Sequence, residues 1–429
     1  MLFRSMPPNL SWLWRVPSAS GYGPLMLSRI SQLLAMSPNG LVADTWTRAS
    51  DRSLDILAIR YLFVSHRNLT PPSLHKGGWL WTADDFSLSL GSGCVTLQPE
   101  AVKFHLPTPL AATAIGMVTS LGCSTAVPDE ATVLQIAVTD TRGTVHRQQV
   151  LAGRDTSEWA YDCEDVLPHM QHRRATIFEG FLNERHSFKS CEGHTYLTMR
   201  PLEGIMDVNS IELQWVGPAG AIGIQKISLL DEQNGRSFPL SAVSLAVADG
   251  ARWRHVEDIG ETVVYENLRA MPCVWMVPEV VTLTPQEVLR AIQTSQLPDG
   301  RIYDPAQLAL VEEPLTLQAP KRETGTAHVV HISDTHLDVH TISPTPSFLV
   351  LSDAHYPGWE VTIDGVATHV FRTNYVLRGV MVPAGRHVVR FAFRPRSLYL
   401  GASISAVAAA CLLGMVAIGA WRRACQAPV

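Results

Sequence analysis

The sequence predicts an α+β fold that is predominantly β and ends in a membrane-spanning helix. Between about residues 88 and 250, short runs of β-branched and apolar residues alternate with turns rich in Gly and Pro, as is typical of antiparallel strands. Residues 325–396 repeat this pattern on a smaller scale. Residues 398–421 carry no charged side chain, and about 20 apolar residues are enough to cross a bilayer as a helix.

The predicted elements form six consecutive segments. In order these are a mixed α/β segment at 1–87, a jelly-roll-like β-sandwich at 88–250, an α/β segment at 251–324, a smaller β-sandwich at 325–396, a transmembrane helix at 397–421 and a short tail at 422–429. The third segment is expected to pack with the first. Two β-sandwiches and one transmembrane helix are therefore the predicted architecture.

Helix and strand signals mark the first and third segments. Residues 21–36 predict a short helix after a Gly-Pro turn, and residues 54–64 predict a helix end that runs into a buried strand. Residues 265–277 are predicted as one strand. In the helix that follows, Thr284 is the expected N-cap and Glu287 is the partner that completes a capping box.

The second sandwich contains strands of alternating polarity. Along residues 387–395 the apolar side chains share one face, while Arg390 and Arg394 share the other. This alternation is typical of an antiparallel strand that is buried on one face. The Asp364-Gly365 dipeptide predicts a two-residue hairpin turn, and residues 383–385 (PAG) are read as a second hairpin turn.

One polar stretch, residues 331–340 (HISDTHLDVH), has an Asp-x-His spacing that resembles the first metal motif of calcineurin-like metallophosphoesterases. The further ligands that such a two-metal site needs are missing from the sequence. Residues 327–342 are instead read as one strand whose acids and histidines, Asp334 and His336 among them, share a polar face. We predict no metal site and no cofactor.

Charge and cysteine content narrow the function classes. The net charge of −5 and the scattered Lys and Arg residues predict that nucleic acid is not a partner. The seven cysteines show no zinc-ligand spacing. Free buried thiols are the preferred interpretation, and a disulfide such as Cys163 with Cys191 is the alternative if the bulk of the chain is extracytoplasmic.

A polar loop in the first sandwich, residues 155–174, combines acids, aromatic rings and histidines. Carboxylates accept hydrogen bonds from sugar hydroxyls, and aromatic rings offer an apolar face to a ligand. The predicted glycan-binding residues are Asp155, Glu158, Trp159, Tyr161 and Asp162. A plain surface loop is the alternative. The catalytic residues are left unassigned, because the usual catalytic fingerprints are missing from the sequence.

The predicted transmembrane helix carries a stripe of small residues, Ala402, Ala406, Ala410 and Gly414. Such a stripe predicts either close packing with partner helices or an Ala-rich anchor that contacts only lipid. A single C-terminal span would leave the preceding residues in the cytosol unless another segment directs them across, and the N-terminal residues lack the apolar run of a signal peptide. We therefore expect either a tail-anchored protein or the distal part of a longer one.

Residues 349–405 contain three short motifs. The motif residues are Tyr356, Pro357, Gly358 and Trp359 in a YPGW turn, Asp364 and Gly365 in a hairpin, and Pro383 and Gly385 in a VPAG turn. With these motifs, residues 349–405 resemble the end of the bacterial YfhO-type membrane protein family. Shorter pieces at 21–30, 54–64, 265–277 and 303–313 agree with the family in the same order. Structural roles are expected for the motif residues. The chain departs from the family at Cys273, where Arg is common.

The resemblance implies a large multi-pass glycosyltransferase of the GT-C type, which uses a polyprenyl-phosphate sugar donor to modify cell-envelope glycans. It covers the extracytoplasmic portion and the last helix but not the membrane bundle that holds the catalytic carboxylate, so this chain alone is expected to be inactive as a transferase. The implied location is the bacterial plasma membrane. The implied partners are membrane lipid, further transmembrane helices, and a glycan or polyprenyl-linked sugar.

Two other functions stay open at this point. The first alternative is a stand-alone, membrane-anchored protein that binds carbohydrate without catalysis. The second, and least favoured, is a metal-dependent phosphoesterase that uses Asp334 and His336.

Overall fold

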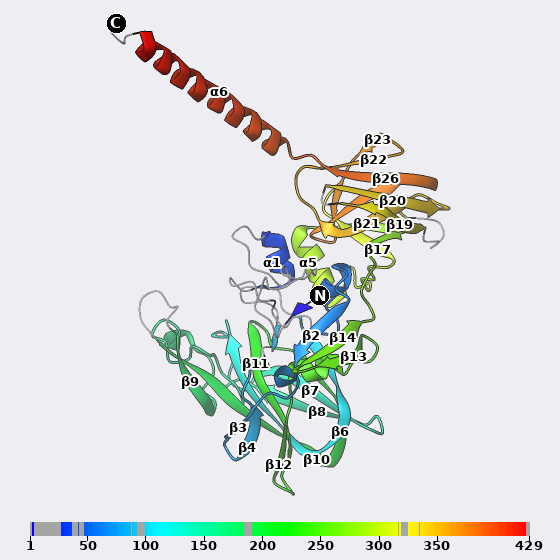
Figure 1. Ribbon diagram of the computed structural model, residues 1–429. Helices are drawn as coiled ribbons and strands as arrows, with labels where there is room; N and C mark the ends of the chain where they lie inside the picture. The colour runs from blue at the N-terminus through cyan, green and yellow to red at the C-terminus, as the bar shows by residue number, and fades with distance from the viewer. Residues whose placement is uncertain are drawn as a thin grey trace. The chain divides into compact units, whose positions relative to one another are not determined.

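The computed structural model describes residues 2–3, 27–36, 42, 47–86, 88–91, 99–183, 191–315, 317–318, 325–333 and 335–425. The chain forms two compact units (Figure 1). The first comprises Met1–Met271 and Leu289–Tyr303, and the second comprises Pro272–Val288 and Asp304–Val429. Strands dominate both units, which confirms the predicted fold class. The boundaries of the six predicted segments stay predictions.

The first unit is built on a long antiparallel ribbon of two strands, β6 (Ala101–Gly122) and β10 (Cys191–Trp215). The register between them shifts twice, between Pro201 and Met206 and between Val208 and Ser210. Such irregularities bend a ribbon. The other strands that extend this sheet are β5 (Leu88–Gly91), β7 (Thr132–Asp140), β8 (Val145–Leu151), β9 (Ile177–Asn183), β11 (Ala221–Asp231) and β12 (Arg236–Pro239).

The two halves of the bent ribbon carry different neighbours. The C-terminal half of β10 pairs with β7, which pairs with β8, whereas the C-terminal half of β6 pairs with β11. One apolar core lies between the halves and contains Phe104, Ile136, Ile211, Ile224 and Ile227, all nearly inaccessible to solvent. Burying each such side chain contributes roughly 1.5–3 kcal/mol. The sheet therefore folds over itself into the predicted sandwich, visible in the lower part of Figure 1.

A smaller four-stranded sheet completes the first unit. It contains β1 (Leu2–Phe3), β2 (Tyr61–Ser65), β13 (Trp253–Ile259) and β14 (Thr262–Asn267). Short helices accompany it: α1 (Ser28–Leu33), α2 (Ser53–Ile56), α3 (His66–Leu69) and α4 (Ala242–Val247). The first unit also contains a hairpin of β3 (Ser73–Lys76) and β4 (Trp79–Thr82) and a short 3-10 helix, η3 (Leu167–His169).

The sequence signals near the N-terminus fit these elements. The predicted passage from helix to strand within residues 54–64 is confirmed by α2 and β2. The helix predicted for residues 21–36 is confirmed at Ser28–Leu33, and residues 21–26 lie outside the described residues.

The single strand predicted for residues 265–277 is wrong. The structure has two strands there, β14 and β15 (Val274–Val277), which belong to different sheets. The chain leaves the first sheet after Asn267, whose side-chain amide turns inward and donates to Asp55 at 2.9 Å. Pro272 has no N–H and cannot continue a ladder of backbone hydrogen bonds.

The second unit is a sandwich of two sheets. The first sheet contains β15, β16 (Glu279–Thr282), β17 (Leu308–Val311), β18 (Leu317–Gln318), β21 (Ser347–Ala354), β24 (Phe371–Thr373) and β25 (Leu377–Val382). The second contains β19 (Thr326–Ile332), β20 (His336–Ser343), β22 (Trp359–Ile363), β23 (Val366–Thr368) and β26 (Gly385–Phe393). Buried residues of both sheets, such as Leu349 and Val389, share one core, as predicted.

Helix α5 (Pro285–Thr294) begins with the predicted capping box. The Glu287 carboxylate accepts hydrogen bonds from the Thr284 backbone N–H at 2.9 Å and from the Thr284 hydroxyl at 2.8 Å. The Glu287 N–H donates to the Thr284 hydroxyl oxygen at 3.4 Å. These contacts satisfy backbone donors that have no partner inside the helix.

Two turn predictions in the second sandwich have different outcomes. The Asp364-Gly365 hairpin is confirmed, because β22 and β23 pair directly on either side of it. The hairpin predicted at residues 383–385 is wrong, because β25 and β26 lie in different sheets. Gly385 has φ of +126°, a conformation that favours glycine, and it redirects the chain from one sheet to the other.

The predicted single strand at residues 327–342 is also wrong. β19 and β20 form an antiparallel hairpin instead, with Ile332 opposite Leu337. The Ser333 N–H donates to the His336 carbonyl at 2.8 Å and closes the turn. Asp334 lies outside the described residues. The predicted alternation of buried and exposed residues holds only along β20.

The chain ends in helix α6 (Arg396–Cys425), the red helix of Figure 1. Residues Arg396–Ile418 are long and apolar enough to cross a membrane, and none of that span is buried in the protein. A helix with apolar side chains exposed on every side is suited to lipid rather than water.

Candidate functional site

The predicted glycan-binding loop is held in place by a disulfide. Cys163 in this loop is bonded to Cys191 at the start of β10. Cys123 is disulfide-bonded as well, whereas Cys273 is free. The preferred interpretation of free buried thiols is therefore wrong for Cys163, Cys191 and Cys123. The alternative interpretation, a disulfide between Cys163 and Cys191, is confirmed, and the chain bends back over 28 residues to bring the two sulfurs together.

Glu158 is one of two predicted site residues that lie inside the protein. Its side chain is only 3% exposed, and its carboxylate accepts from the Ser124 N–H at 2.8 Å and from the Ser124 hydroxyl at 2.7 Å. Burial raises the pKa of this carboxyl, and the bonds from Ser124 partly offset that rise. The Tyr196 hydroxyl donates to the Glu158 carbonyl at 2.8 Å. Glu158 thus anchors the loop to the sandwich.

Asp155 is the other buried site residue. Its carboxylate accepts from the Leu151 N–H at 2.7 Å and from Arg154 Nε at 3.1 Å, and it also pairs with Arg200. Asp155 therefore holds two arginines in place, and its oxygens are occupied by the protein itself.

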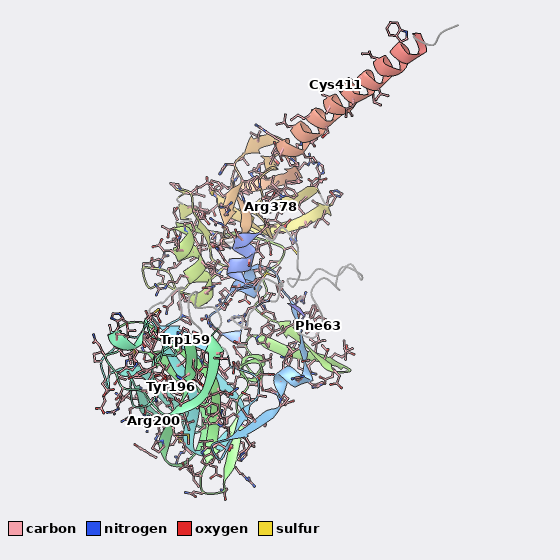
Figure 2. The ribbon with its side chains drawn as sticks, turned by 90° about the vertical axis from the view of Figure 1, so that its left-hand side faces the viewer. Phe63, Trp159, Tyr196, Arg200, Arg378 and Cys411 are labelled. Carbon is pink, nitrogen blue, oxygen red and sulfur yellow. A yellow bond between two sulfur atoms is a disulfide. The ribbon has the colours of Figure 1, made fainter. Side chains whose placement is uncertain are left out.

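The other three predicted residues reach the surface. Trp159 and Tyr161 are half-buried, and the Asp162 side chain is 35% exposed. The Trp159 ring stacks on Phe181 of β9, with ring centroids 6.2 Å apart and planes 14° apart. We call Trp159, Tyr161, Asp162 and Phe181 the aromatic rim. Figure 2 shows Trp159 on the same sandwich as Tyr196 and Arg200.

A glycine in β10 makes this arrangement fit. A Cβ atom on Gly193 would lie 2.6 Å from the Phe181 ring and 3.0 Å from the Trp159 ring. The His194 N–H donates to the Trp159 carbonyl at 2.8 Å. The two rings therefore pack flat on the β10 backbone because no side chain separates them from it.

Asp162 has its carboxylate held from two sides. Its Oδ2 atom lies 2.8 Å from His194 Nε2 and accepts from Arg174 Nη1 at 2.5 Å. His194 is buried, whereas the Arg174 side chain is 45% exposed. The rim thus presents a fixed carboxylate and an exposed guanidinium beside the aromatic rings, an arrangement suited to hydroxyl groups on an apolar ring.

Sequence analysis missed a second surface, a hollow of about 400 Å³ over β7 and β8. We call it the arginine–glutamine hollow. It is lined by Gln135, Arg147, Gln148, Gln149, Arg154 and Arg200. Gln135 lies directly opposite Gln149 in the neighbouring strand, so both side chains share one face of the sheet. The signal in the sequence is the run of polar residues His146–Gln149 in β8 with Gln135 in β7, which also fits a plain solvated face.

The hollow carries a positive charge. Three guanidinium groups line it, and Asp155 is the carboxylate that pairs with Arg154 and Arg200. Burial and the neighbouring Arg154 lower the pKa of Arg200 to about 10, so that it stays charged at neutral pH. Within the described residues, Arg147 has no ion-pair partner. Such a surface attracts an anionic group, and the three amides suit hydroxyls.

The family-motif residues have structural positions in the second sandwich. Gly358 has φ of +108°, and a Cβ atom there would lie 2.9 Å from Pro395, so glycine is required. Trp359 covers the guanidinium of Arg378, which is labelled in Figure 2. Asp364 accepts from the Val388 N–H at 2.8 Å.

The polar stretch at residues 331–340 holds no metal-ligating cluster in its described part. Among the residues that the structure describes, no group of three or more His, Cys, Asp or Glu side chains is arranged to hold a metal ion. Asp338 pairs instead with Arg390, at 2.9 Å from its Nε, and this contact lowers the pKa of the Asp338 carboxyl.

Comparison with known proteins adds a family for part of the chain. Residues 292–405 match the family model described as bacterial membrane protein YfhO. A search of curated proteins found no match.

Similarities to solved structures are weak. The cryo-EM structure of arabinofuranosyltransferase AftD from Mycobacteria is 11% identical, with 81% of this chain and 25% of that chain covered and a TM-score of 0.19. A Bacillus subtilis oxalate decarboxylase is 10% identical, with 77% and 81% covered and a TM-score of 0.10. At such TM-scores neither similarity supports an inference about fold or activity. This chain spans a quarter of the length of AftD.

Proposed function

We propose that this chain is the extracytoplasmic portion and membrane anchor of a glycosyltransferase-like protein, because residues 292–405 belong to the family of the bacterial membrane protein YfhO. Membrane association follows from the family and from α6. The role in cell-envelope glycan modification and the side of the membrane are parts of the proposal. In it, the first sandwich binds the acceptor glycan and α6 packs with further membrane helices.

The disulfide between Cys163 and Cys191 is the observation that carries the extracytoplasmic location. Disulfides persist in oxidising compartments such as the periplasm or the cell surface and are rare in the cytosol. A bulk outside the cytoplasm is also where envelope glycans are found. With α6 as the anchor, the sandwiches then lie on the outer side of the plasma membrane.

The aromatic rim supports the glycan-binding part of the proposal. Trp159 and Tyr161 offer ring faces for the apolar side of a sugar, and Asp162 accepts hydrogen bonds from hydroxyls. Of the five residues predicted from sequence, these three have surface available to a ligand. Asp155 and Glu158 would contribute to glycan binding indirectly, because they anchor the loop that carries the other three residues.

The test is binding of the full chain, in nanodiscs, to an array of bacterial envelope glycans. Trp159→Ala and Tyr161→Ala should each weaken binding about twofold to tenfold, since stacking on one ring contributes roughly 0.5–1.5 kcal/mol. Leu167→Ala is the matched control, because Leu167 is 49% exposed in the same loop but lies outside the rim. Glycan binding that survives both rim variants would contradict the role of the rim.

A stand-alone carbohydrate-binding protein remains the second candidate, and the rim supports it equally. The two functions differ in whether α6 packs with further membrane helices. The first predicts that the chain copurifies from its native membrane with further membrane helices, whereas the second predicts glycan binding by a chain that is complete by itself. Crosslinking in native membranes followed by mass spectrometry distinguishes them.

A further inference from the structure

One end of the five-stranded sheet in the second unit meets the start of α6. β26 ends at Phe393, and α6 begins three residues later. The Arg394 N–H donates to the Gly358 carbonyl at 2.6 Å, and the Phe393 N–H donates to the Thr335 carbonyl at 2.8 Å. The YPGW turn and the turn between β19 and β20 therefore lie at the level of the first residues of α6. We call this end of the sheet the helix-side edge.

Large apolar side chains are exposed at the helix-side edge. Ile332, at the tip of the hairpin between β19 and β20, is 74% exposed, and Tyr356 in the YPGW turn is 49% exposed. Trp359 and Phe393 lie beside them, half-buried, with ring centroids 5.2 Å apart. Exposed apolar side chains on the tips of turns are costly in water unless something covers them.

Two arginines and one glutamate lie at the same edge. Arg394 pairs with Glu360 at 3.7 Å, whereas Arg396 is exposed, and within the described residues it has no ion-pair partner. His331 and His336 are exposed as well, and His331 lies opposite Asp338 in the hairpin, on the other face from Ile332. Aromatic rings combined with Arg side chains are typical of protein surfaces at the bilayer interface, where lipid phosphates are the counter-ions.

We propose that the helix-side edge inserts into the headgroup layer of the bilayer that α6 crosses, with Ile332 and Tyr356 in contact with lipid. The position of the helix supports this occupant. Leu398, Tyr399 and Leu400 are each at least 60% exposed and belong in or next to the hydrocarbon. At a rise of about 1.5 Å per helical residue, Arg396 lies only about 3 Å further out than Leu398. The headgroup layer is roughly 5–8 Å thick on each side.

In this proposal, the polar stretch at residues 331–340 contributes a contact with lipid instead of a metal site. The hairpin supplies an apolar contact in Ile332, and β20 ties that contact to the core of the sandwich through Leu337, which lies opposite Ile332. The sandwich is then held at two points, by α6 and by this edge, which restricts its rotation about the helix axis. This inference does not depend on glycan binding by the first sandwich.

The experiment measures the depth of single labels in the full chain. An environment-sensitive NBD label is placed on Ile332→Cys, on Tyr356→Cys or on Val366→Cys, in a background where Cys273, Cys411 and Cys425 are replaced by Ser. Val366 is the matched control, because it is 72% exposed in the same sheet. Its hairpin bonds to Val388, five residues before Phe393, which is about 17 Å along the strand.

In nanodiscs that contain phosphatidylglycerol, the labels at 332 and 356 should show blue-shifted emission and strong quenching by lipids with a headgroup or shallow doxyl group. The label at 366 should show emission typical of water and little quenching. Retention of the Cys163–Cys191 disulfide in each labelled protein verifies the fold. Equal, water-like emission at all three positions would overturn the proposal. A blue shift at 332 without quenching by doxyl lipid would also overturn it, because a protein partner would then cover the edge.

Discussion

The guanidinium carbon of Arg378 lies 3.7 Å from the ring centroid of Trp359, inside the second sandwich. Arg378 is 1% exposed and also faces the Phe391 ring at 5.8 Å. Burial lowers the pKa of Arg378, while Asp353, its ion-pair partner, acts in the opposite direction. A buried cation held between an aromatic ring and a carboxylate stabilises the sandwich by stacking as well as by charge.

Replacement of Arg378 by Ala should destabilise the protein by about 3–5 kcal/mol, because it removes a buried, stacked side chain and leaves a cavity under Trp359. Chemical denaturation of the full chain in detergent, followed by tryptophan fluorescence, measures this loss. Arg386→Ala is the control, since Arg386 is exposed at the other end of the same sandwich. Equal stability of the two variants would show that the stacked arginine is dispensable.

Asp51 should make stability fall as the pH rises. Burial raises its pKa from 3.8 to about 6, with the Ser53 N–H and nearby arginines acting in the opposite direction. Because the folded state holds this proton more tightly than the unfolded chain does, the stabilisation is complete below about pH 4. It is lost as the pH rises through 6, by about 3 kcal/mol at most.

Asp51→Asn removes this titration and keeps the acceptor for the Ser53 N–H, which lies 2.7 Å from Asp51 Oδ1. The difference in unfolding free energy between the variant and the parent should grow between pH 4 and 6 in favour of the variant. Denaturation curves at several pH values measure it. If the two proteins have parallel pH profiles, Asp51 does not titrate in this range.

The Cys163–Cys191 disulfide should stabilise the loop that carries the aromatic rim. Removing Cys163–Cys191 by a double Ser substitution should cost about 2–4 kcal/mol, since the bond closes a loop of 28 residues. A non-reducing peptide map of protein taken from its native membrane should contain the linked Cys163 and Cys191 peptides, and Cys273 should react with a thiol reagent. Reduced Cys163 in freshly alkylated cells would argue against an extracytoplasmic sandwich.

Gly193→Ala should displace the two rings of the rim. Phe181 is 43% exposed and has room to move, so we expect a destabilisation of only about 1 kcal/mol, together with a red shift in tryptophan emission and weaker glycan binding. Gly250→Ala is a suitable control, because a Cβ atom there would meet nothing within 4 Å. Unchanged emission and glycan binding in Gly193→Ala would mean that the stacked geometry has no role.

The fold could be predicted from local patterns where each strand follows them. Alternation identified β26, the capping residues identified α5, and uniform apolarity identified α6. The errors arose where apolar patterning continued across a change of sheet, at Pro272 and at Gly385, because hydrophobicity does not encode which sheet a strand joins. Register and connections depend on contacts between distant residues.

The candidate site was less predictable for a similar reason. The loop composition suggested five binding residues, but the sequence does not reveal that Ser124 and Arg200, far along the chain, engage Glu158 and Asp155 from within. The arginine–glutamine hollow combines residues of three separate segments. Only the folded sheet brings Arg147, Arg154 and Arg200 together.

The bent ribbon of β6 and β10 has a consequence for how the first sandwich folds. Ala101 pairs with Gln214, and Tyr196 pairs with Thr119, so one half of β6 has no partner until residues 196–201 are available and the other half none until residue 214 is available. Contacts between residues this far apart in sequence form slowly, because a long loop must close first. β6 therefore remains an unpaired apolar strand until those residues are available, and an unpaired strand of this kind is prone to aggregate before the sheet forms.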